Sequence, residues 1–412
     1  MPSYERRHNG DLDPEREPLG PILDRDVEED EVYEEDHEED LRVSGMSALL
    51  SDRRQLALGI ALFLALVAAI YVLFPRVVGL DDELARIQDA DWRWIAVAIA
   101  FNVAAFAAYV ALFRGVLGGS VASAVKRRLD MRASYQITMA GLAATRIFSA
   151  AGVGGIVLTY WALRKAGMPR RRSACRMVAF LVLTYSVYAF ALILFGILLR
   201  TGVLPGEDPV AGTIVPAALA GGALLVAVLI ALIPDDLERY LSSYEGRGRL
   251  GRIAAKLAPI PTTAASGLRT AFDYIRHPRR GALAVGGAVG FWAANIGVLW
   301  ASFEAFGGDL PFAVLVQGFF VGMAANLIPS PAGGVGSVDA GMIGAFVLFG
   351  VPGGIVFPAV LTYRVIAFWL PIPPGIVAFF QLRRTVARWE NERQGSYTSE
   401  SKVTAEAGSG SL

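Results

Sequence analysis

Long apolar runs separated by short charged connections make up most of the chain between residues 55 and 380. A helix of about 20 apolar residues is long enough to cross a hydrocarbon layer of about 30 Å. Six runs reach this length, so the pattern predicts an all-α, polytopic integral membrane protein with about six spanning helices. The six runs are residues 55–74, 92–113, 177–199, 213–233, 281–303 and a final apolar helix from about 354 to 380.

Two further apolar stretches, 134–163 and 311–349, are interrupted by glycine and proline, at 150–155 and at 329–336. Each arm of the first stretch has about 14 residues and reaches roughly 20 Å, less than the hydrocarbon thickness. We expect both stretches to be re-entrant hairpins, whose irregular backbone must be covered by protein or by a water-filled cavity. The alternative for the second is that residues 311–328 cross the membrane by themselves.

Arginine and lysine collect in a few connections, at residues 114–133, 164–176, 234–281 and after 382. Basic connections remain on the inner side of a membrane. We therefore expect a multi-pass protein of the plasma membrane with both termini in the cytoplasm. Hairpin 134–163 then begins and ends inside, hairpin 311–349 begins and ends outside, and the two enter the membrane from opposite faces.

Residues 136–155 and 317–336 are similar at a single offset, 317 − 136 = 181. Chance similarity between Ala- and Gly-rich segments is one explanation. A true internal repeat is the other, with copies at about 55–199 and 213–380 that are inverted relative to each other, as in many secondary transporters. The matched pairs are Gln136/Gln317, Gly141/Gly322, Ala143/Ala324, Ala144/Ala325, Ile147/Ile328, Ser149/Ser330, Ala151/Ala332, Gly152/Gly333 and Gly155/Gly336.

The charges are segregated, although the chain is 54% hydrophobic and its formal net charge is zero. Residues 24–40 are almost all acidic, and like charges without apolar partners do not fold. We therefore expect residues 1–50 to be a disordered cytoplasmic tail, 51–390 to be the membrane domain and 391–412 to be a second disordered tail.

The connection 234–281 is expected to be a basic, amphipathic, cytoplasmic loop. Apolar residues at helical spacing predict two short helices in it, at 237–244 and 268–275, lying on the inner membrane surface.

Arg146, just before the first break, and Arg364, in the last run, are the costliest residues at membrane depth, where an arginine normally faces a cavity or a partner. Guanidinium pairs bidentately with phosphate, and half-helix ends carry partial charge. Asp339 is a candidate counter-ion. The alternatives are snorkelling or a structural tie for the arginines, and an N-cap or exposed position for Asp339.

Signs of enzymatic chemistry are few. The histidines, His8, His37 and His277, have no metal-ligand spacing, and the glycine runs lack the lysine and the strand–helix context of a phosphate-binding loop. We expect no enzyme activity, metal or cofactor. The expected partners are membrane lipids with anionic or phosphate-bearing head groups, and not nucleic acid.

Several motifs resemble the lysylphosphatidylglycerol synthase transmembrane-domain family, also called flippase-like or UPF0104. They are Ser149-Ala-Ala-Gly-Val-Gly-Gly, Leu163-Arg-Lys-Ala-Gly, Asn326-Leu-Ile-Pro-Ser-Pro-Ala-Gly-Gly-Val-Gly, and Tyr363-Arg364 ahead of Phe368-Trp369. In full-length synthases of that family, this domain is thought to move an aminoacylated lipid that a soluble C-terminal domain makes. The final polar segment here is too short for that domain, so the resemblance implies the translocating part alone.

The expected function is a lipid translocase that moves a phosphate-bearing lipid or lipid-linked head group between leaflets. A membrane-embedded transferase acting on a lipid-linked substrate and a small-solute transporter are the alternatives. The expected substrate-binding residues are Arg146, Ser149, Gly152, Asn326, Ser330, Gly333, Asp339 and Arg364.

Overall fold

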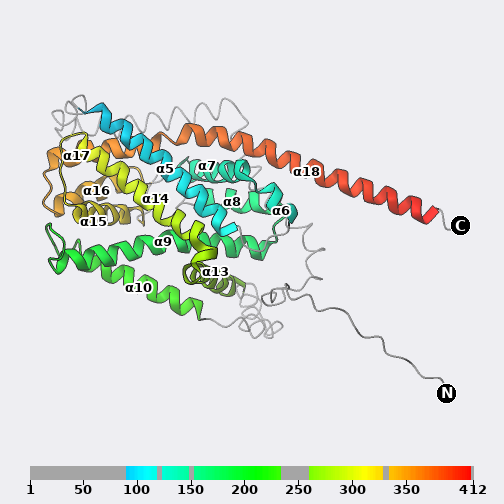
Figure 1. Cartoon of the computed structure of the whole chain (residues 1–412), viewed down its shortest axis with the longest axis horizontal. Coiled ribbons are helices and arrows are strands. Elements are labelled where there is room, and N and C mark those ends of the chain that lie inside the picture. Colours follow the sequence, from blue (N-terminus) through cyan, green and yellow to red (C-terminus); the bar gives the residue numbers. More distant parts are fainter. Residues whose placement is uncertain (1–89, 118–122, 148–152, 233–258, 328–333, 410–412) are drawn as a thin grey trace, which may run out of the picture. The chain divides into compact units, whose positions relative to one another are not determined.

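The computed structural model describes residues 90–117, 123–147, 153–232, 259–327 and 334–409, and these ranges contain helices and no strand (Figure 1). The all-α prediction is confirmed for this part of the chain. The helices are α5 (Trp92–Leu117), α6 (Ser123–Arg128), α7 (Met131–Ile147), α8 (Val153–Lys165), α9 (Arg170–Arg200), α10 (Ile214–Ala231), α13 (Pro259–Arg276), α14 (Pro278–Glu304), α15 (Phe312–Met323), η3 (Ala324–Leu327), α16 (Ser337–Leu348), α17 (Gly353–Arg364), η4 (Val365–Trp369) and α18 (Ile372–Ser409).

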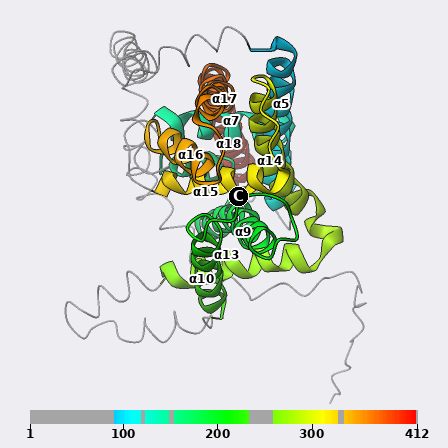
Figure 2. The same ribbon diagram turned by 90° about the vertical axis from the view of Figure 1, so that its left-hand side faces the viewer.

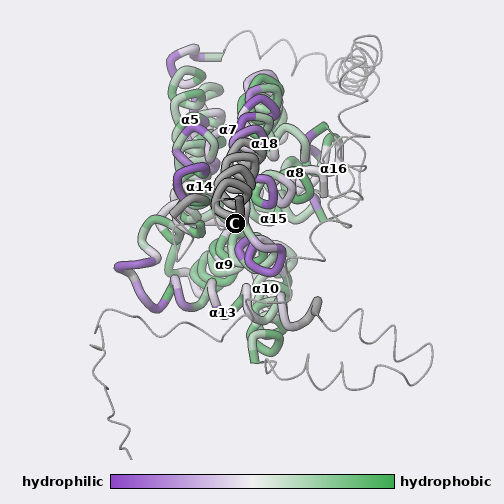
Figure 3. The backbone as a smooth tube through the Cα atoms, turned by 90° about the vertical axis from the view of Figure 1, so that its right-hand side faces the viewer, coloured by the Kyte–Doolittle hydropathy of each residue, from purple (hydrophilic) through white to green (hydrophobic). Residues whose placement is uncertain are grey.

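Five helical stretches in the described ranges are long and apolar enough to cross a membrane: α5, α9, α10, α14 and the stretch 353–392. Figure 3 shows their hydrophobic colouring, which is continuous along most of α10. Only 6% of the most apolar window of α10 is buried by protein, as expected of a helix that faces lipid. The sixth predicted span, 55–74, lies outside the described residues, as do the acidic tail 1–50 and the first predicted surface helix, 237–244.

Each predicted hairpin contains two short helices that pack on each other, α7 with α8 and α15 with α16. At 1.5 Å per residue, the 17 residues of α7 reach about 25 Å and the 12 residues of α15 about 18 Å. With η3, the apolar helix Phe312–Leu327 reaches about 24 Å. Both lengths are below about 30 Å of hydrocarbon, and the re-entrant arrangement stays a prediction. The matched glycines of the repeat, Gly141 and Gly322, lie where the paired helices come closest: a side chain at Gly322 would meet the Met342 backbone at 2.5 Å.

The two halves meet along α5 and α14, which lie side by side in Figures 1 and 2. Gly287 lies directly against the backbone of Leu112, and Gly115 lies against Ala284. Rising residue numbers on one helix therefore face falling numbers on the other, which makes the pair antiparallel. Two copies of one unit with opposite membrane orientation require this direction.

The hairpins also pack reciprocally across the two copies. Helix α7 of the first copy lies against α18, where the Thr385 hydroxyl donates a hydrogen bond to Gln136 Oε1 (2.9 Å). Helix α15 of the second copy lies against α9, where the Tyr188 hydroxyl donates to the Phe320 carbonyl (2.5 Å). In each case, a hairpin of one copy contacts the last helix of the other copy. This exchange supports the inverted repeat.

The second predicted surface helix, 268–275, is present within α13, and protein covers part of its apolar face, whereas Ile275 is 48% exposed. Leu268 and Ala271 are buried, and Gly267 lies against Val178 of α9. The placement of this helix on the membrane surface stays a prediction, and the burial of Leu268 and Ala271 was not anticipated. The reason is that helical spacing identifies an apolar face but not the partner that covers it.

The last apolar run is not one continuous helix, contrary to the prediction. The sequence Pro371-Ile-Pro-Pro374 removes three amide donors within four residues. Before it, the chain widens into the π-helical turn η4, where the Leu370 amide donates to the Val365 carbonyl (2.9 Å). After it, Pro373 and Pro374 lie in the first turn of α18, where proline is tolerated.

This break leaves three consecutive carbonyls in need of donors, and side chains from the first copy supply them. The Asn102 amide donates to the Ile366 carbonyl (2.9 Å). The Arg146 guanidinium donates to the Ala367 carbonyl (Nη2, 2.9 Å) and to the Phe368 carbonyl (Nη1, 2.8 Å). These bonds favour the structural-tie alternative for Arg146, because polar backbone away from water must find partners within the protein.

We predict that Arg146→Gln lowers the thermal unfolding temperature of the purified protein, since a buried carbonyl left without a donor costs about 1–3 kcal/mol. Pro371→Ala restores one backbone donor to the same turn, so the Arg146→Gln loss becomes smaller in the Pro371→Ala background. The four proteins of this double-mutant cycle are compared in one detergent. An equal loss in both backgrounds would contradict the link between Pro371 and Arg146.

Candidate functional site

Both hairpins meet the last span at the ring of Phe368. Ile147 at the end of α7 and Val335 in the turn before α16 pack in one hydrophobic cluster with Phe368. Two guanidinium groups also lie against this ring, with Arg364 Cζ 4.4 Å and Arg146 Cζ 5.2 Å from its centroid. An aromatic ring attracts cations within about 6 Å. The two costliest residues of the membrane segments are thus brought to one place.

Arg364 is buried, with 4% of its surface exposed, and Asp339 is its acidic partner. The Arg364 Nε atom lies 2.6 Å from Asp339 Oδ1, and Nη2 donates to the Gly334 carbonyl at 3.2 Å. A buried charge needs such pairing, because leaving it alone in a low-dielectric environment costs several kcal/mol. Asp339 is therefore the counter-ion that the sequence proposed, and it binds Arg364.

Asp339 also closes the start of α16. Its Oδ2 accepts the Gly336 backbone N–H at 2.8 Å, and Gly334 and Gly336 both have positive φ, of 90° and 85°. Such backbone favours glycine, which explains why the break is rich in it. Both interpretations of Asp339 made from the sequence hold together: one oxygen caps the helix and the other binds Arg364. The helix end already has an anionic partner, so it is not an open anion site.

Asn326 lies on the other side of the same turn. It is exposed, and a Cβ added at Gly334 would be 2.8 Å from its Oδ1 atom. Asn326 therefore borders the backbone segment that receives Arg364, without a described contact to either charged group.

The structure therefore brings together three of the predicted site residues, Arg146, Asp339 and Arg364, and places a fourth, Asn326, at their border. The other four lie outside the described residues, so their role stays a prediction: Ser149, Gly152, Ser330 and Gly333.

Phe368 and Asn102 are the participants whose roles the sequence did not reveal. Phe368 was part of a motif, but nothing in the pattern distinguished it from the other aromatics of the run. Asn102 carried a usable signal, because a polar amide inside an apolar span usually binds a polar group. The missing information was the helix break at Pro371, which creates the carbonyl that Asn102 binds.

The Phe368 cluster consists of Phe368, Arg146, Arg364 and Asp339. It contains two cations and one anion and could accept one further negative group. Within the described ranges, no group of three or more His, Cys, Asp or Glu residues has the geometry to hold a metal ion. The chemistry that the described residues offer is recognition of an anion by guanidinium.

Comparison with known proteins agrees with this architecture. The family model of the lysylphosphatidylglycerol synthase TM region matches residues 56–375. Two curated proteins of Methanothermobacter thermautotrophicus, each named "UPF0104 membrane protein", are 31% identical over 86 and 87 residues, which is 21% of this chain and 26% of their own length. The chain thus aligns with about a quarter of each of these relatives. No solved structure matches. The family model covers most of the chain, and the protein belongs to the lysylphosphatidylglycerol synthase transmembrane-region family.

Proposed function

We propose that the protein is a lipid translocase that moves a phosphate-bearing head group between leaflets past the Phe368 cluster. The observation that carries this proposal is the pair of arginines, Arg146 and Arg364, held on one ring where two broken segments meet. A phosphate needs such a pair to leave water, because an isolated anion at membrane depth is costly.

The proposed step is an exchange of anions at Arg364. In the resting protein, Asp339 neutralises Arg364 at 2.6 Å. An entering phosphate takes one side of the guanidinium, whose flat fork can hold two oxygens, while Asp339 keeps its bond to the Gly336 N–H. Arg364 then exchanges its ion pair with Asp339 for one with the lipid head group, and few charged groups lose their partners during the exchange.

The membrane arrangement that goes with this proposal has two re-entrant hairpins that enter from opposite faces, with both termini in the cytoplasm and the plasma membrane as location. The short helices and the reciprocal packing of α7 on α18 and α15 on α9 support it. Inverted-repeat transporters place their substrate where such broken helices meet.

A lipid-linked transferase is the second candidate named by the sequence, and it would need an available carboxylate such as Asp339. Both oxygens of Asp339 already have partners, which favours a binding role for this residue over that of a general base. A small-solute transporter would use the same cluster, and only its ligand would differ.

The transport proposal predicts that removing both charges of the ion pair slows lipid movement. The variant is Arg364→Gln with Asp339→Asn, because Arg364→Ala alone would leave a buried carboxylate unpaired at a cost of about 3–5 kcal/mol. Head-group-labelled anionic lipid is followed in liposomes by quenching of the outer leaflet. We expect at least about a tenfold slower transfer, as loss of one charge-assisted contact implies.

The control removes an exposed ion pair of the same type, Arg200→Gln with Asp208→Asn, whose partners are 2.9 Å apart and almost half exposed. It should transfer lipid at the wild-type rate. Wild-type transfer by the Arg364/Asp339 variant would exclude this pair from the path. Transfer at the level of empty liposomes by the unmodified protein, across several lipid classes, would remove the translocase itself.

The membrane arrangement is tested by cysteine labelling in a Cys175→Ser background. Met131→Cys and Arg172→Cys mark the two ends of the first hairpin, and Asp309→Cys and Gly353→Cys mark the ends of the second; all four positions are exposed. An impermeant reagent should label the first two from the cytoplasm and the last two from outside. Labelling of positions 309 and 353 from different sides would mean that one arm crosses the membrane by itself.

A further inference from the structure

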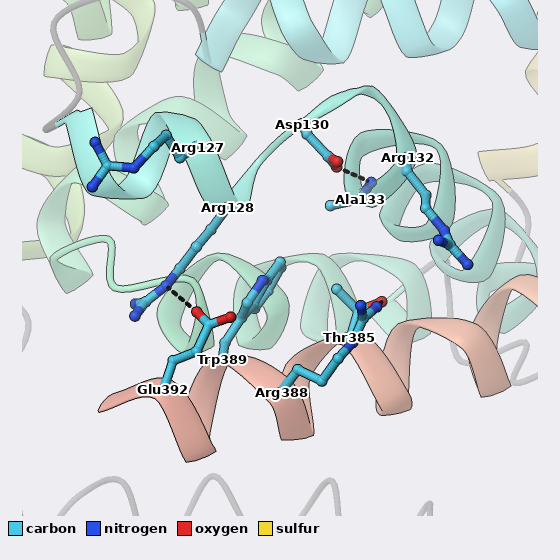
Figure 4. Close-up of a pocket in the computed structure, with 9 residues that line it drawn as sticks. All are labelled: Arg127, Arg128, Asp130, Arg132, Ala133, Thr385, Arg388, Trp389 and Glu392. Carbon is cyan, nitrogen blue, oxygen red and sulfur yellow. Dashed lines mark hydrogen bonds and ion pairs between the residues drawn. The ribbon is translucent and has the colours of Figure 1, made fainter. Parts of the chain in front are cut away.

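A cavity of about 380 Å³ lies where α6 and the start of α7 meet α18 (Figure 4). None of its lining residues belongs to the Phe368 cluster. Small-ligand sites usually occupy about 300–1,000 Å³, so the volume is sufficient for a small polar group. Its lining combines polar and charged side chains with one large aromatic: Arg127, Arg128, Asp130, Arg132, Ala133, Thr385, Arg388, Trp389 and Glu392.

The charge of the lining is unbalanced. Four arginines and two carboxylates line the cavity, and both carboxylates already have partners. Asp130 Oδ1 accepts the Ala133 backbone N–H at 2.7 Å and so caps α7, while Glu392 lies 4.0 Å from Arg128 Nε, as Figure 4 shows. The cavity therefore has an excess of two positive charges.

The wall of the cavity is fixed by buried residues. Trp389 and Thr385 are buried, and the Thr385 hydroxyl donates to Gln136 Oε1 (2.9 Å). Arg388 in turn donates to the Thr385 hydroxyl at 3.1 Å, which leaves most of its guanidinium donors available. An arginine held by such a network, as Arg388 is, loses less side-chain entropy when it binds an anion.

We propose that this cavity is a second phosphate-binding site, separate from the Phe368 cluster. Its position supports this chemistry, because it lies at the start of α7 and beside the last residues of the apolar stretch Gly353–Glu392, where a lipid head group would lie. A phosphate group carried by an anionic lipid and one carried by a soluble compound share the recognition chemistry, which is guanidinium pairing with phosphate oxygens. The site does not depend on transport.

The test measures binding to the purified full chain in detergent by isothermal titration. One arm uses short-chain phosphatidylglycerol below its micelle concentration, and the other uses inorganic phosphate. We expect Arg132→Gln with Arg388→Gln to weaken binding by at least about tenfold, the effect of losing one charge-assisted contact. Binding of the lipid alone identifies a head group, and equal binding of inorganic phosphate identifies a soluble ligand.

The matched control is Arg383→Gln with Arg384→Gln, which removes two exposed charges from α18 outside the cavity. It should bind like the unmodified protein. Equal weakening in both variants, or no binding in either arm, would overturn the proposal. Unchanged elution and melting temperature check the fold, and Arg132→Gln alone replaces the double variant if that variant aggregates. A failed transport assay leaves this test unaffected.

Discussion

Hydrogen-bond satisfaction of the backbone at membrane depth is the constraint on which the arrangement of the helices depends. Pro371, Pro373 and Pro374 interrupt the last span, and the carbonyls of the η4 turn lose their helical donors. Asn102 and Arg146 replace those donors. Because these side chains come from α5 and α7, the break fixes where α5 and α7 lie relative to the last span. Helix α14 follows, since it is packed along α5.

Much of the fold could be predicted, because the lipid environment simplifies the pattern. Apolar length alone identified α5, α9, α10 and α14, and glycine and proline located the breaks within the helix pairs α7/α8 and α15/α16. The last span was misread because Ile372 and the apolar residues around it preserve hydrophobic continuity across the prolines. Hydrophobicity indicates whether a segment lies in lipid, whereas the continuity of a helix depends on backbone amide donors. These two signals in the sequence disagree only at such breaks.

The charged residues of the candidate site could be predicted from the sequence, but the contacts that each of them makes could not. Arg146, Asp339 and Arg364 stood out because charge at membrane depth is costly. Their roles differ, however: Arg364 is paired with a carboxylate, whereas Arg146 supports a helix break. That difference depends on which carbonyls lack donors, and this follows only from the folded backbone. The ring of Phe368, which contacts both guanidinium groups, had no distinguishing feature in the sequence.

The glycine contacts between α5 and α14 limit how the molecule can move. At Gly115 and Gly287, the two backbones touch with no side chain between them, so there is no layer of side chains that could slide or change rotamer there. We therefore expect α5 and α14 to move together as one rigid pair. Shape changes must therefore be taken up by elements with looser surroundings, such as α10, which has the least buried apolar window of the five candidate spans in the described ranges.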